Sequence, residues 1–160
     1  GYEVKGKVSD VQKWMGHNYF IAVGDNSDRL VLWSKLRSYG LTYVNVVHPR
    51  ATLCSPPKCV GTFFAAGSHL GPNSTVGSFS IMNTHACLEH DSRMGEFSHM
   101  APCSVTGGSV SIGDITMIGL GAIIRDGVTI GRKTKIGMGS VVTGNIGDNC
   151  VAYGNPARVR

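Results

Sequence analysis

Residues 110–142 read VSIGDI TMIGLG AIIRDG VTIGRK TKIGMG SVV, and the third position of every block of six is apolar. The same period runs back without a break to Phe64, and Thr106 is its one polar member. The whole series is Phe64, Leu70, Val76, Met82, Leu88, Met94, Met100, Thr106, Ile112, Ile118, Ile124, Ile130, Ile136 and Val142. An α-helix repeats every 3.6 residues and a strand every two, so neither produces this spacing. A solenoid of short parallel strands does, and hexapeptide repeats are its known signature.

Small residues repeat with the same period. A small or β-branched residue lies two positions before each apolar member from Leu70 onward, and glycine commonly follows the apolar member, as at Gly71 and Gly77. We expect the apolar side chain to fill the interior, and Gly or Asn to supply the tight backbone at each corner. Three blocks of six would complete one triangular coil, so residues eighteen apart would be stacked at about 4.8 Å.

The predicted fold class is therefore mainly β, a parallel β-helix of hexapeptide repeats. The left-handed coiling that we expect is typical of such repeats and does not follow from the spacing. Each coil would be stabilised by its stacked neighbours, because no coil buries its apolar side chain alone. The alternative is an irregular β-sandwich with accidental periodicity, which fourteen positions without a slip disfavour.

Residues 1–48 do not follow the period of six. They predict a buried strand over 20–25 and a helix that is capped by Asn26 or Ser27 and ends near Tyr39. A second strand over 43–47 completes a β-α-β fragment. The polar face of the helix would expose Arg29, Lys35 and Arg37.

The sequence predicts two domains, an α/β subdomain over 1–48 and a β-helix with a short C-terminal tail over 49–160. Residues 50–63 look like an imperfect first coil, because Leu53 and Cys59 are one residue out of phase with Phe64. A slip near Val60 and Gly61 would account for this difference.

The net charge of +5 is concentrated near the C-terminus. Residues 1–124 carry nine Lys/Arg against eight Asp/Glu, whereas 125–160 carry six against two. A basic end that includes Arg158 suits an anionic ligand such as a phosphorylated cofactor, and a solvated basic edge is the alternative. A nucleic-acid partner is disfavoured, because aromatic residues do not alternate with the basic ones.

The five cysteines are an odd number without the spacing of a disulfide framework, which predicts reduced thiols in a cytoplasmic protein. No signal peptide or membrane-length apolar run is present, so no membrane partner is expected. The first residue is not Met, which suggests a processed or incomplete N-terminus.

Four of the six histidines fall between residues 69 and 99. His90 lies two positions after inward Leu88, so its ring should point outward, and adjacent Asp91 can orient it as a general base. An exposed histidine without a function is the alternative. Gly108 lies eighteen residues after His90 and should leave open space and a free N–H beside the ring. His99 falls on the far side of the coil, so a site that uses both histidines would need two chains, most simply in a trimer.

At these residues the chain resembles the hexapeptide-repeat acyltransferases. It is most similar to bacterial sugar acetyltransferases of the sialic acid O-acetyltransferase and UDP-4-amino-sugar N-acetyltransferase type. The similar segments are Ala22-Val23-Gly24-Asp25-Asn26, Val47-His48-Pro49, Asn83-Thr84, Glu89-His90-Asp91, Gly95-Glu96-Phe97-Ser98-His99 and Tyr153-Gly154-Asn155-Pro156-Ala157-Arg158.

This resemblance implies a homotrimer that uses acetyl-CoA to acetylate an amino group, or a hydroxyl, of a sugar or nucleotide sugar. His90 matches the catalytic base and Asp91 the acid that orients it. His99 matches a histidine near the thioester, and Gly108 a glycine whose amide faces the acetyl carbonyl. Asn83 matches a substrate contact, and Asp10 an acidic residue that closes the second strand of the sugar-nucleotide domain.

The chain departs from the family at its beginning. The family's sugar-nucleotide domain starts with a strand, a Gly-rich turn and a helix, whereas this sequence begins at Gly1–Val4, where the second strand would start. We therefore expect a truncated subdomain over 1–48. Two other functions are considered: a non-catalytic trimeric scaffold that binds CoA or sugar, and a trimeric metalloenzyme with ligands at His85, His90 and His99.

Overall fold

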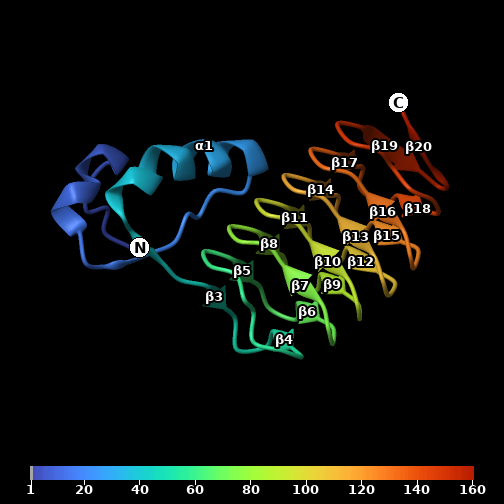
Figure 1. Cartoon of the computed structure of the whole chain (residues 1–160), viewed down its shortest axis with the longest axis horizontal. Coiled ribbons are helices and arrows are strands. Elements are labelled where there is room, and N and C mark those ends of the chain that lie inside the picture. The colour runs from blue at the N-terminus through green and yellow to red at the C-terminus, as the bar shows by residue number, and fades with distance from the viewer. Residues whose placement is uncertain (1) are drawn as a thin grey trace.

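The computed structural model describes residues 2–160, and three parallel sheets form the walls of a solenoid (Figure 1). The β11 wall contains β3 (Val46–Val47), β5 (Phe63–Phe64), β8 (Ile81–Met82), β11 (His99–Met100), β14 (Met117–Ile118), β17 (Lys135–Ile136), β19 (Val151–Gly154) and the antiparallel β20 (Ala157–Val159). The β9 wall contains β4 (Thr52–Leu53), β6 (His69–Leu70), β9 (Cys87–Leu88), β12 (Val105–Thr106), β15 (Ile123–Ile124) and β18 (Val141–Val142). The β10 wall contains β7 (Thr75–Val76), β10 (Arg93–Met94), β13 (Ser111–Ile112) and β16 (Thr129–Ile130).

The register of these walls confirms the predicted parallel β-helix. Ile81 pairs with His99 and His99 with Met117, so partners are eighteen residues apart. The first coil is one residue shorter, because Val46 pairs with Phe63 and Thr52 with His69. The predicted slip in the first coil is therefore present.

The solenoid interior is filled by the apolar series. Its fourteen members, Thr106 included, are between 0 % and 7 % exposed. The hydroxyl of Thr106 accepts the N–H of Glu89 at 3.1 Å, so the one polar member is satisfied. The small residues are also buried, and their hydroxyls link coils: Ser98 Oγ accepts the N–H of Thr116 at 3.0 Å.

The prediction that glycine or asparagine supplies the tight corner backbone is confirmed at some corners but not at all of them. The left-handed corner backbone belongs to the third residue after the apolar one, which is Asn73 (φ 58°) or a glycine such as Gly67 (φ 68°) at some corners and another residue such as Asp91 (φ 57°) at others. The glycines directly after the apolar residues are needed for close approach of the next coil. A Cβ on Gly113 would lie 2.5 Å from the backbone nitrogen of Arg132.

This contact gives a stability prediction. Gly113→Ala should lower the free energy of unfolding by about 1–3 kcal/mol, because the obstructing atoms are backbone and cannot rotate away. Gly144→Ala is the matched control, since within residues 2–160 its added Cβ would meet no atom within 4 Å apart from its own residue and its two chain neighbours. Chemical denaturation of both variants measures the difference, and equal stability would contradict the close-approach role.

The N-terminal segment (residues 2–45) contains a two-stranded parallel sheet. It also contains the α-helix labelled α1 in Figure 1. Its elements are η1 (Val8–Trp14), β1 (Asn18–Tyr19), α1 (Asn26–Leu36), η2 (Arg37–Tyr39) and β2 (Thr42–Tyr43). Residues 2–7 form no strand, and Gly1 lies outside the described residues. No helix within residues 2–160 is long and apolar enough to cross a membrane.

Three details of this segment differ from the prediction. The strand predicted over 20–25 lies earlier, in β1, and the strand predicted over 43–47 is divided, because its end pairs with the solenoid as β3. The N-cap of α1 is Asp25, whose carboxylate accepts the N–H groups of Ser27 and Asp28 at 2.9 and 3.0 Å. The division into domains at residues 48 and 49 stays a prediction.

Arg29 is buried rather than exposed, with 1 % of its surface accessible. Its guanidinium donates to the carbonyl oxygens of Phe79 (2.6 Å), Phe97 (2.9 Å) and Ser98 (3.3 Å). Burial lowers the pKa of Arg29 to about 10, so the group stays protonated at neutral pH. This charged side chain attaches the first turn of α1 to the solenoid.

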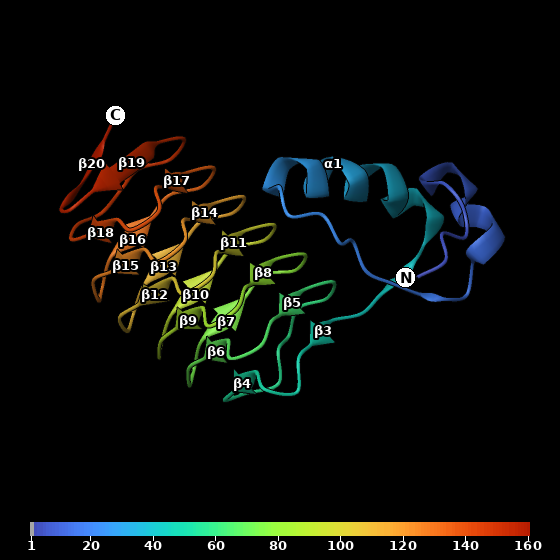
Figure 2. The same cartoon turned by 180° about the vertical axis from the view of Figure 1, so that it is seen from behind.

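Aromatic side chains complete the attachment. Phe79 and Phe97 stack with ring centroids 5.2 Å apart, and Trp33 of α1 packs on both rings. In both views α1 lies beside the turns that lead into β8, β11 and β14 (Figures 1 and 2). The helix thus holds residues 20–25 against the β11 wall.

Candidate functional site

His90 and Asp91 lie at the corner between the β9 and β10 walls. The His90 ring points outward, as the period predicts, and its Nδ1 lies 2.8 Å from Oδ2 of Asp91. Both side chains are about half exposed, at 55 % and 52 %. Asp91 has the left-handed corner conformation.

The electrostatics favour a fixed and basic imidazole. The hydrogen bond to Asp91 raises the pKa of His90, and the same bond lowers the pKa of Asp91. Asn73, one coil earlier, donates from Nδ2 to Oδ1 of Asp91 at 3.2 Å. With Nδ1–H donated to the carboxylate, Nε2 of His90 keeps its lone pair and can accept a proton.

Gly108 lies over this ring, one coil later. A Cβ added to Gly108 would be 2.3 Å from Cε1 and 2.4 Å from Nε2 of His90. The space expected beside the histidine is therefore filled by the ring itself, because the glycine lets it approach the backbone. Within residues 2–160 the N–H of Gly108 has no acceptor.

His99 lies on the β11 wall and is only 8 % exposed. Its Nε2 is 3.0 Å from Nδ2 of Asn83, which is a donor, so Nδ1 carries the proton. Nδ1 is buried and has no hydrogen-bond partner in the described part of the chain. Burial, with a smaller contribution from the charge of Arg29, lowers the pKa of His99.

A cleft of about 360 Å³ opens beside this pair. Its walls include Ile21 and Val23 from the N-terminal segment, and Ile81, Asn83 and His99 from the solenoid. The cleft is mostly apolar, with a histidine and an amide at one side. Such a pocket suits a small ligand that combines apolar and hydrogen-bonding groups.

The predicted site residues thus fall in separate places. His90, Asp91 and Gly108 lie together, and Asn83 and His99 form a second pair on another wall. Arg158 lies on β20, at the far end of the solenoid. Asp10 lies in η1 rather than at the end of a strand, and its carboxylate accepts from Lys7 N and Lys13 Nζ.

The three histidines of the metalloenzyme alternative do not lie close together within the described part of one chain. His85, His90 and His99 form no group of three ligand atoms within 4.8 Å of one another among residues 2–160. Asn73 is the residue that the sequence reasoning missed beside His90. The eighteen-residue register would have found it, because it lies one coil before Asp91.

No protein-family model matches the chain. Solved structures do. PerB from Caulobacter crescentus, in complex with CoA and GDP-perosamine, is 35 % identical with a TM-score of 0.90, over 96 % of this chain and 74 % of that one. A further similar structure from Caulobacter crescentus, also in complex with CoA and GDP-perosamine, is named as that of a perosamine N-acetyltransferase.

Two further structures are similar over most of their length. The acetyltransferase domain of PglB from Neisseria gonorrhoeae is 27 % identical with a TM-score of 0.94, over 100 % of this chain and 80 % of that one. WeeI from Acinetobacter baumannii is 25 % identical with a TM-score of 0.86, over 94 % and 76 %.

Proposed function

Because this chain belongs to the hexapeptide-repeat sugar N-acetyltransferases, we propose that it transfers acetyl from acetyl-CoA to the amino group of a nucleotide sugar. The observation that carries this proposal is the His90–Asp91 pair at an outer corner, with the free N–H of Gly108 against the ring. PerB was crystallised with CoA and GDP-perosamine, and the PglB domain also with acetyl-CoA. These complexes support a CoA thioester as donor and an amino sugar as acceptor.

In the proposed reaction, Nε2 of His90 removes a proton from the acceptor amine as its nitrogen attacks the thioester carbonyl. The new C–N bond forms, the C–S bond breaks, and the CoA sulfur receives the proton from His90. Asp91 stabilises the imidazolium that forms between these steps. The N–H of Gly108 offsets the developing oxyanion charge, a contribution of about 3–4 kcal/mol for one well-placed donor. We assign Asn83 to the acceptor, His99 to the thioester and Arg158 to the anionic part of CoA.

We also propose that the protein is a homotrimer. His90 and His99 lie at different places on one solenoid, so a site that uses both needs a neighbouring chain. Apolar side chains are exposed near the corner between the β11 and β9 walls: Leu120 (55 %), Ile123 (50 %) and Met138 (80 %). Light scattering of the purified protein should give three times the chain mass of 17.0 kDa. A monomer would contradict this assembly.

An acceptor assay tests the proposed reaction. Purified protein is mixed with acetyl-CoA and either GDP-perosamine or a UDP-4-amino sugar, and free CoA thiol is measured. We expect thiol release that requires the amino sugar and is absent with the corresponding hydroxyl sugar. Release with the hydroxyl sugar alone would make oxygen the acceptor. CoA binding without turnover on any acceptor would favour the scaffold alternative.

Gly108→Ala should lower kcat while leaving the fold intact. Its Cβ would overlap the exposed His90 ring, and this ring can rotate away. The rotation would break the His90–Asp91 hydrogen bond but would leave the stacking of the coils unchanged. Loss of this positioning should reduce kcat by about 10²-fold. The control is Gly144→Ala, whose Cβ would meet no atom within 4 Å among the described residues other than its chain neighbours. Wild-type kcat in Gly108→Ala would remove this glycine from the site.

A further inference from the structure

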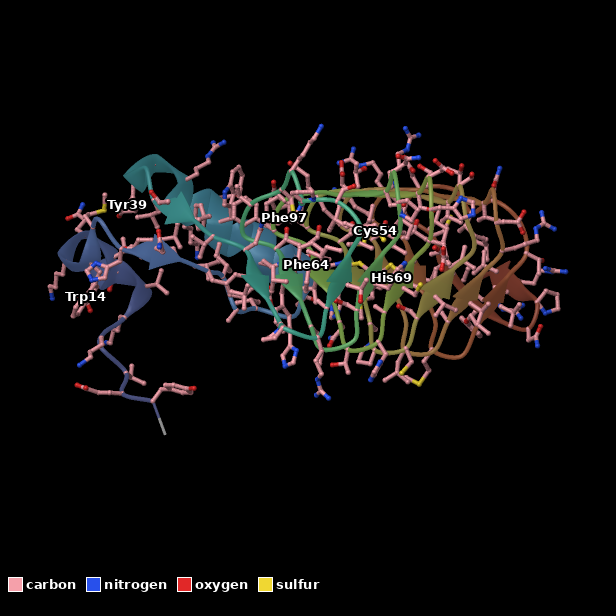
Figure 3. The ribbon with its side chains drawn as sticks, turned by 90° about the horizontal axis from the view of Figure 1, so that it is seen from below. Trp14, Tyr39, Cys54, Phe64, His69 and Phe97 are labelled. Carbon is pink, nitrogen blue, oxygen red and sulfur yellow. The ribbon has the colours of Figure 1, made fainter. Side chains whose placement is uncertain are left out.

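A second cluster of reactive side chains lies on the outer face of the β9 wall. His69 and Cys87 are direct partners on neighbouring strands β6 and β9, and Glu89 follows Cys87 by two residues. All three side chains are half-buried. One imidazole nitrogen, the thiol sulfur and one carboxylate oxygen lie within 4.8 Å of one another. Figure 3 labels His69 on the solenoid, far from Trp14 and Tyr39 of the N-terminal segment.

We propose that His69, Cys87 and Glu89 bind one zinc ion or a similar borderline transition-metal cation. Imidazole, thiolate and carboxylate are the three ligand types that Zn²⁺ takes in proteins. Mg²⁺ and Ca²⁺ prefer oxygen ligands alone, so the sulfur and nitrogen of this set select against them. The three protein ligands leave a fourth tetrahedral position for water.

The geometry requires only small side-chain movements. With metal–ligand bonds of about 2.0–2.3 Å, tetrahedral ligand atoms lie about 3.3–3.8 Å apart. The three atoms here are already within 4.8 Å, so rotations about side-chain bonds can close the set. The backbone is fixed by strand pairing, which holds His69 and Cys87 side by side before any cation arrives.

The existing hydrogen bonds are compatible with this role. The thiol of Cys87 donates to Oε1 of Glu89 at 3.6 Å, so a cation would replace the thiol proton, which is released to solvent. Oε2 of Glu89 accepts the N–H of His90 at 3.3 Å, which orients the carboxylate from its other side. The metal proposal does not depend on the acetyl-transfer proposal, because it uses neither His90, Asp91 nor Gly108 as a ligand.

The test is metal binding by the full chain after treatment with EDTA. Zn²⁺ is titrated in competition with a chromophoric chelator, and bound metal is counted by mass spectrometry. We expect one zinc per chain in the wild type. Cys87→Ser and His69→Gln should each weaken binding by more than the roughly 10–100-fold that loss of an outer-shell partner costs. Cys103→Ser is the matched control, since Cys103 is exposed and belongs to no such group within residues 2–160.

Two further readouts separate ligand loss from misfolding. Co²⁺ should give a thiolate charge-transfer absorption in the wild type and in Cys103→Ser, and none in Cys87→Ser. Zn²⁺ should also raise the Tm of the wild type but not of Cys87→Ser, because only a cation bound to the folded state stabilises it. Substoichiometric zinc in the wild type would overturn the proposal. Unchanged affinity in both ligand variants, with their folds intact by circular dichroism, would overturn it equally.

Discussion

Replacing His90 with alanine should lower kcat for acetyl transfer by about 10²–10⁴-fold, the range that a positioned general base contributes. The ring is half exposed and its Nδ1 is hydrogen bonded to Asp91, so its loss opens no cavity in the core. Stability should therefore be unchanged. The rate of CoA thiol release at saturating acceptor measures the effect directly.

His85→Ala is the matched control for this experiment. His85 is also an exposed corner histidine, and its ring covers Gly67 as that of His90 covers Gly108. No hydrogen bond or ion pair joins its ring to a carboxylate within residues 2–160, so it lacks the partner that makes His90 a candidate base. We expect wild-type kcat in His85→Ala. Equal losses in both variants would point to a general effect of corner substitutions and would contradict the assignment.

Replacing Arg29 with methionine should lower the free energy of unfolding by about 2–6 kcal/mol, because two buried carbonyl oxygens would be left without a donor. Methionine fills much of the same volume but donates no hydrogen bond. The carbonyl oxygens of Phe79 and Phe97 would lose their donor, at about 1–3 kcal/mol for each group that stays buried and unsatisfied, whereas that of Ser98 keeps the N–H of Ile81. Urea denaturation followed by tryptophan fluorescence measures the loss, because Trp33 packs on the same Phe pair.

Arg37→Met is the control for the Arg29 variant. Arg37 is exposed, and its guanidinium lies 5.8 Å from the centroid of the Trp33 ring. A cation–π contact at an exposed position contributes about 0.5–1 kcal/mol, so this variant should lose no more than that. A loss below 1 kcal/mol in Arg29→Met would mean that α1 is held by its aromatic contacts instead.

The period of six was sufficient to predict the solenoid, because each inward residue from Phe64 to Val142 contributes independently to the same pattern. It also predicted the stacking of Gly108 on His90, which depends only on a separation of eighteen residues. The role of Gly113 was not predicted. The backbone that leaves no room for a Cβ there belongs to Arg132 in the next coil, and the conformational preferences of residues near Gly113 in the sequence do not reveal this contact.

The burial of Arg29 could not be predicted from α1 alone. A charged residue in an amphipathic helix is normally exposed, and here the acceptors are carbonyls of turns 50 and 68 residues away. The hydrogen bond between His99 and Asn83 could not be predicted either, because these residues are sixteen apart and the coil repeats every eighteen. The cleft beside them depends on how residues 20–24 cross the β11 wall, which is tertiary structure.

A crystal structure with acetyl-CoA bound would test the central claim most directly. The account predicts that the acetyl carbonyl oxygen accepts the N–H of Gly108, and that the thioester carbon lies within reach of an amine hydrogen bonded to Nε2 of His90. A thioester bound away from this corner, with the His90 ring facing only solvent, would contradict it.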